Sequence, residues 1–139
     1  MSRRASTFDR LALKEQVMIN GQLRGLGELN NEFQRVDQMR QKLEGLASEQ
    51  VPNDGEQIAG TFRVTAQLNH QIRKQLETAN NRCDYLALEL QNMRKEIALS
   101  SRRREKSASK ADELRTYERK QSETKREDEE ASRRRTSRA

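Results

Sequence analysis

The chain has little of what a compact globular domain needs. It contains no tryptophan, one proline and one cysteine, and aromatic residues make up 4% of it. Hydrophobic residues reach 32% where a compact domain would be close to half apolar, and charged residues reach 36%. No apolar run approaches the ~18 residues of a membrane-spanning helix, and Met1-Ser2-Arg3-Arg4 is not followed by the apolar stretch of a secretory signal. These absences predict a soluble, intracellular protein built from long helices.

Catalytic and metal-binding residue types are equally scarce. The one histidine, His70, and the one cysteine, Cys83, are separated by about 20 Å at 1.5 Å per residue if they lie on one helix, too far for a thiolate–imidazole pair. A metal site would need further ligands, and no phosphate-binding glycine motif is present. A single cysteine also excludes an intramolecular disulfide. We therefore expect no catalytic residues, no cofactor, no metal and no enzymatic activity.

The most regular pattern is a heptad repeat between residues 58 and 97. Its core positions alternate in steps of four and three, which is typical of the seam of a coiled coil. The polar Asn69 at a core position is of the type that fixes register and oligomeric state. The residues of this predicted seam are Ile58, Phe62, Thr65, Asn69, Ile72, Leu76, Ala79, Cys83, Leu86, Leu90, Met93 and Ile97.

A second, less regular apolar stripe precedes it. Its spacing slips near Met39, and the three glycines between residues 21 and 27 each cost roughly 0.5–1 kcal/mol relative to alanine in a helix. We expect a kink or break at 21–27. The residues of this stripe are Leu26, Leu29, Phe33, Val36, Met39, Leu43 and Leu46.

Breakers and charge divide the chain into successive segments. Pro52 and Asn53-Asp54-Gly55 predict a turn between two helices. The fold class is all-α: an elongated helical hairpin or coiled coil forming part of a multi-helix bundle, with a charged, largely disordered or marginally helical C-terminal tail. The predicted segments are a basic lead (1–7), a first helix (8–50), a turn (51–55), a heptad helix (56–100) and the tail (101–139).

The predicted seam is a weak zipper by itself. Thr65 and Ala79 are poor core residues, and the flanking heptad positions are mostly uncharged, which disfavours pairing with a second copy. Apolar residues outside the core positions widen the face toward that of a bundle. The sequence therefore predicts association with other coiled-coil proteins, with a hetero-oligomer favoured over a homo-oligomer. The residues of the two stripes, with Ala79 and Thr65 left aside, are the expected partner-facing residues.

The tail carries most of the positive charge, with 14 basic and 9 acidic residues from position 100 onward. Basic clusters can bind nucleic acid or a cytoskeletal filament weakly, through charge alone, although a solvated extension is the simpler interpretation. Three serines that follow pairs of basic residues match the pattern read by basophilic kinases. The polyanion-binding candidates are Arg102, Arg103, Arg104, Lys106, Arg133, Arg134 and Arg135, and the phosphorylation candidates are Ser6, Ser122 and Ser137.

The helix–turn–helix plan with a charged tail resembles, in general terms, small coiled-coil subunits of kinetochore, vesicle-tethering or cytoskeletal complexes. The sequence thus predicts a non-enzymatic structural subunit of a multi-protein coiled-coil assembly. Two alternatives stay open: an adaptor whose basic tail binds nucleic acid or a filament, and a homodimeric coiled-coil spacer. The pattern does not choose between cytoplasm and nucleus.

Overall fold

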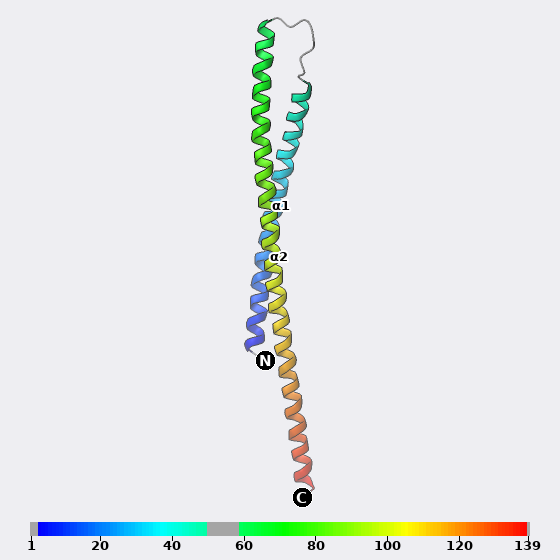
Figure 1. Ribbon diagram of the computed structural model, residues 1–139. Coiled ribbons are helices and arrows are strands. Elements are labelled where there is room, and N and C mark those ends of the chain that lie inside the picture. Colours follow the sequence, from blue (N-terminus) through cyan, green and yellow to red (C-terminus); the bar gives the residue numbers. More distant parts are fainter. Residues whose placement is uncertain (1–2, 50–58, 139) are drawn as a thin grey trace. The chain divides into compact units, whose positions relative to one another are not determined.

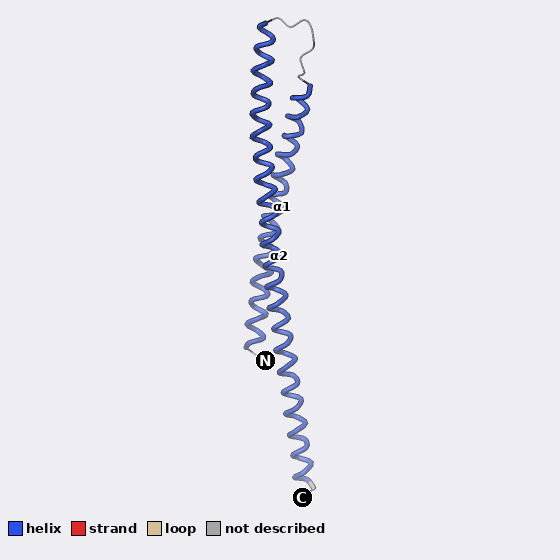
Figure 2. The backbone as a smooth tube through the Cα atoms, viewed as in Figure 1, coloured by secondary structure: helices blue, strands red, loops and turns tan. Residues whose placement is uncertain are grey.

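A computed structural model describes residues 3–49 and 59–138 of the chain. Over these residues it contains two α-helices, α1 (Arg3–Glu49) and α2 (Ala59–Ser137), and no strand. The helices pack against each other in opposite directions as a helical hairpin (Figures 1 and 2). The all-α hairpin predicted from the sequence is therefore confirmed. The predicted turn at 51–55 and the first seam residue, Ile58, lie outside the described residues.

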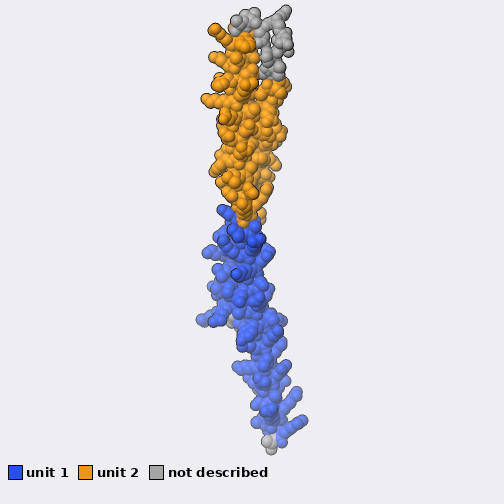
Figure 3. Space-filling view, in the orientation of Figure 1, with its two compact units in different colours: residues 1–22, 96–139 blue, residues 23–95 orange. Residues whose placement is uncertain are grey.

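The packing divides into two compact units, each built from a stretch of both helices (Figure 3). Unit 1 comprises Met1–Gln22 and Glu96–Ala139, and unit 2 comprises Leu23–Lys95. Each unit has its own seam between α1 and α2. Their seams differ in composition.

In unit 2 the seam is mainly apolar on both helices. Leu86 is 1% exposed and is the largest fully buried side chain. Glu32 of α1 and Arg82 of α2 form an ion pair at 2.5 Å across the two helices. The other buried seam residues of unit 2 are Ile72, Ala79, Cys83 and Leu90.

The α1 seam does not slip at Met39. Met39 is 60% exposed, and Arg40 takes the seam position instead, half-buried. Its guanidinium bonds Asp37 and Glu44 of the same helix, each at 2.8 Å. The hydrogen bond with Asp37 is the main reason that the pKa of Arg40 is raised above its ordinary value. The predicted stripe is therefore wrong at Met39. The seam residue is Arg40, whose charged end forms ion pairs beside the seam.

The glycines do not break α1, which is continuous through residues 21–27. Burying an isoleucine or leucine side chain stabilises by about 1.5–3 kcal/mol, which exceeds the cost of one helical glycine. Ile19 is buried and Leu26 is half-buried. Seam residues therefore lie before the first of the three glycines and between the last two. A Cβ atom on Gly25 would lie 3.3 Å from Cε of Met93, so this glycine allows a close approach of α2.

In unit 1 the seam continues where the sequence predicted a tail. α2 does not end near Ser100, which is buried at a seam position. A row of buried or half-buried residues of α2 keeps the same alternation of three and four, but all of them except Leu114 are small or polar. A pattern of large apolar residues therefore does not reveal this part of the seam. These α2 residues are Ser100, Arg104, Ser107, Ala111 and Leu114.

The matching stretch of α1 supplies the larger side chains. Arg104 donates a hydrogen bond to Gln16, and Arg115 pairs with Asp9, so α1 runs antiparallel to α2 in this unit as well. Phe8 of α1 is half-buried in this unit, and Ala111 of α2 is 0% exposed. A helix that presents small residues leaves room for larger side chains of the helix packed against it. The predicted lead, 1–7, belongs to this helix from Arg3 onward.

The last turns of α2 are helical without a seam. Residues 119–137 are helical and every one of them is exposed, which agrees with the helical alternative predicted for the tail and with a solvated segment. Glu129 and Glu130 precede Arg133 and Arg134 by four residues, the orientation in which ion pairs support an isolated helix. Basic residues in the last turn also interact favourably with the helix dipole.

Candidate helix-docking grooves

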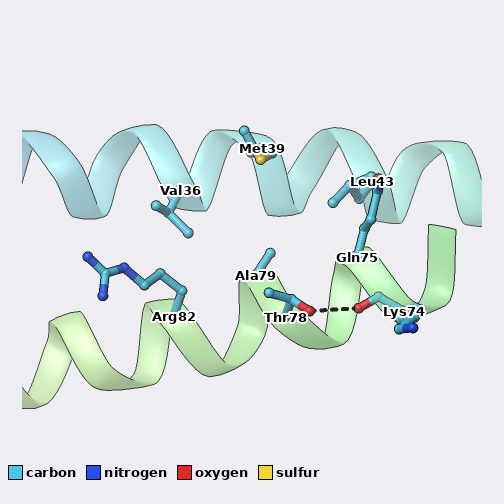
Figure 4. A pocket seen from close by; sticks show the side chains of 8 residues that line it. All are labelled: Val36, Met39, Leu43, Lys74, Gln75, Thr78, Ala79 and Arg82. Carbon is cyan, nitrogen blue, oxygen red and sulfur yellow. Dashed lines mark hydrogen bonds between the residues drawn. The ribbon is translucent and has the colours of Figure 1, made fainter. Parts of the chain in front are cut away.

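One flank of the unit 2 seam carries an open groove of about 530 Å³. Figure 4 shows Val36 and Ala79 projecting between the two helices at this place. We call it the apolar groove. Its lining residues are Val36, Met39, Leu43, Lys74, Gln75, Thr78, Ala79 and Arg82.

Two of the polar side chains that line the apolar groove, Thr78 and Arg82, are engaged within the chain. The Thr78 hydroxyl donates to the Lys74 carbonyl oxygen at 3.0 Å (Figure 4). The Arg82 guanidinium bonds Glu32 and lies 5.5 Å from the centre of the Tyr85 ring. The bond with Glu32 is the main reason that the pKa of Arg82 is raised. Apolar side chains of a second molecule are therefore better suited to this surface than a polar ligand.

Exposed apolar side chains extend the same flank. Met39 and Leu46 are one heptad apart on α1, and Leu68 lies one heptad before Gln75, a groove residue of α2. The ion pair between Glu32 and Arg82 shows that these flanking heptad positions of the two helices adjoin. Exposed apolar surface that extends along a helix pair is typical of an interaction site.

Unit 1 carries a groove of different chemistry, with a volume of about 410 Å³. Its α1 wall is mainly apolar and its α2 wall is rich in cations. Oε2 of Glu15 is buried and has no hydrogen-bond partner among the described residues. We call it the basic groove. Its lining residues are Phe8, Leu11, Glu15, Arg103, Lys106, Ser107 and Lys110.

Most residues predicted for the helix–partner interface lie on the sides of α1 and α2 that pack against each other. They are buried or half-buried, whereas Met39, Leu46 and Phe62 are exposed. Met39 and Leu46 lie at flanking heptad positions of α1, on the outer surface, although the sequence pattern predicted that they belong to the seam. The sequence signal for this outer surface is a row of α1 residues that recur every seven positions, each one position before a seam residue; Met39 and Leu46 belong to it. The buried or half-buried residues are Leu26, Leu29, Phe33, Val36, Leu43, Asn69, Ile72, Leu76, Cys83, Leu86, Leu90, Met93 and Ile97.

The predicted polyanion-binding residues do not share one setting. Arg104 is half-buried at the unit 1 seam, Arg103 and Lys106 line the basic groove, and Arg102 is exposed. The second cluster, Arg133 to Arg135, is exposed at the end of α2. The three candidate phosphorylation sites, Ser6, Ser122 and Ser137, are exposed as well.

Within residues 3–49 and 59–138, no group of three or more histidine, cysteine, aspartate or glutamate side chains is arranged to hold a metal ion. None of the helices in the described part of the chain is long and apolar enough to cross a membrane. His70 is exposed and Cys83 is buried. The absence of enzymatic activity stays a prediction.

Comparison with known proteins does not assign the chain to a family. No protein-family model, curated protein or solved structure matches the chain. The surfaces of the two units are therefore the observations from which a function is inferred.

Proposed function

We propose that the chain is a non-enzymatic structural subunit that assembles with helices of other proteins. The observation that carries this proposal is the apolar groove of unit 2, which stays open after α1 and α2 have packed. Its apolar floor and the exposed Met39 and Leu46 suit the apolar stripe of a third helix. Two helices would then become part of a bundle.

The partner helix comes from a different protein in this proposal. The α2 seam is already occupied by α1, so it is not available for a parallel zipper with a second copy. The exposed segment 119–137 offers no large apolar side chain to fill the groove. In a bundle with a helix of another protein, apolar side chains of that helix cover the groove. Identifying the partner protein would identify the complex.

Site-specific photo-crosslinking in cells tests the proposal. A photoreactive amino acid at Met39 should form cross-links to a helical segment of another protein, identified by mass spectrometry. The same group at Asn81, which is exposed on α2 and does not line the groove, is the matched control. Cross-links from Met39 only to the chain itself, or equal partners at both positions, would contradict the proposal.

A further inference from the structure

The basic groove of unit 1 differs in chemistry from the apolar groove. Its α1 wall presents Phe8 and Leu11, and the latter is 43% exposed. Three cations of α2 line the groove with them: Arg103, Lys106 and Lys110. Long basic side chains present apolar stems to a groove and keep their charged ends at its rim.

The charges of this groove select its occupant. Glu15 is the one acidic residue among its lining residues, so the cations outnumber the carboxylates by three to one. Glu15 is half-buried, and its Oε2 is buried. An incoming helix therefore meets an apolar strip bordered by positive charge. The complementary surface is an apolar stripe bordered by aspartate or glutamate.

We propose that the basic groove binds an acidic amphipathic helix of a second partner protein. Leucine-type side chains of that helix lie against Phe8 and Leu11, and its carboxylates pair with Arg103 and Lys106. Lys110 already forms an ion pair with Glu113 at 3.8 Å and adds positive charge at the rim. The proposal goes beyond the assembly through unit 2, because it assigns unit 1 a partner of its own. The chain would then connect two helices of opposite preference, one apolar and one acidic.

The chain's own acidic segment does not fit the groove. Glu127-Asp128-Glu129-Glu130 carries the complementary charge, but residues 119–137 contain no large apolar side chain to cover Phe8 and Leu11. Nucleic acid would use the same cations yet gain nothing from the apolar wall. The mixture of apolar and basic lining thus favours a helix of another protein over a second copy or a polyanion.

Fluorescence anisotropy with two synthetic peptides tests this inference on the full chain. The first peptide repeats a heptad with leucine at the seam and glutamate at the flanks, and the second replaces each glutamate by lysine. We expect saturable binding of the acidic peptide and none of the basic peptide. Equal binding of both peptides, or no binding of the acidic peptide, would overturn the inference.

Matched variants locate the binding. Arg103→Glu should weaken the acidic peptide at least about tenfold, whereas Arg102→Glu, one residue away and outside the groove, should weaken it much less. Leu11→Ser should weaken it several-fold, whereas Leu13→Ser, at a 65% exposed position outside the groove, should not. Circular dichroism verifies that each variant keeps its helices.

A fluorescent duplex oligonucleotide separates the two kinds of ligand. If the duplex binds more tightly than the acidic peptide, with no effect of Leu11→Ser on either ligand, the groove is a polyanion site and the inference is wrong. Because these measurements probe unit 1 directly, their failure leaves the proposed assembly through unit 2 unaffected. Loss of cross-linking at Met39 would in turn leave the basic groove unaffected.

Discussion

The two units use one heptad alternation with different side chains. Unit 2 buries large apolar residues of α2, such as Leu86 and Leu90, and keeps an apolar groove beside them. Unit 1 buries small residues of α2, such as Ser100 and Ala111, and keeps a basic groove. The spacing of core positions therefore determines where two helices touch, while the size and charge of the residues determine what remains available to a partner.

The largest effect is expected from truncating the core of unit 2. Leu86→Ala should lower the free energy of unfolding by roughly 2–5 kcal/mol, because it removes a fully buried side chain and leaves a cavity. Urea unfolding followed by circular dichroism at fixed protein concentration measures the change. Leu88→Ala, at a 55% exposed position of the same helix, is the control. Equal losses for both variants would show that the seam is not where we place it.

An intermediate effect is expected from enlarging the core of unit 1. Ala111→Leu should destabilise by about 1–3 kcal/mol, since Ala111 is 0% exposed and the added atoms have no free space. Hydrogen exchange should become faster around Phe8 and Ala111 and change little around Leu86. Ala108→Leu, at an exposed neighbouring position, should leave exchange unchanged. A neutral Ala111→Leu variant would mean that unit 1 does not need its small residues.

The smallest effect concerns the glycines of α1. Gly21→Ala should stabilise by roughly 0.5–1 kcal/mol, because a Cβ atom there meets no heavy atom within 4 Å. Gly25→Ala should gain less, since Met93 must move away from the added atom. Thermal unfolding of the two variants gives the comparison. A larger gain at Gly25 than at Gly21 would contradict the close approach of the helices in unit 2.

Much of the hairpin was predictable because large apolar residues mark a heptad clearly. Ile72, Cys83, Leu86 and Leu90 are buried, and they belong to the α2 seam defined by spacing alone. The continuation through Ser100 and beyond was not predictable in the same way. Small residues form a seam only when a partner helix supplies the missing volume, and a single segment does not reveal that partner.

The docking surfaces were harder to predict than the seam. Met39 was assigned to the core because it is apolar, whereas the structure gives that position to Arg40, whose charge is satisfied by Asp37 and Glu44. Arg103 and Arg104 are adjacent and identical in chemistry, yet one lines a groove and the other lies at the seam. Their difference depends on the face of the helix, which requires the correct register.

Sedimentation velocity of the purified chain tests the central claim that the unit 2 groove requires a further helix. The measurement spans a wide concentration range and compares the wild type with Met39→Glu. We expect the wild type to self-associate weakly and reversibly in the absence of its partner, and Met39→Glu to stay monomeric with unchanged helicity. A wild-type chain that is fully helical and monomeric at every concentration would contradict the account.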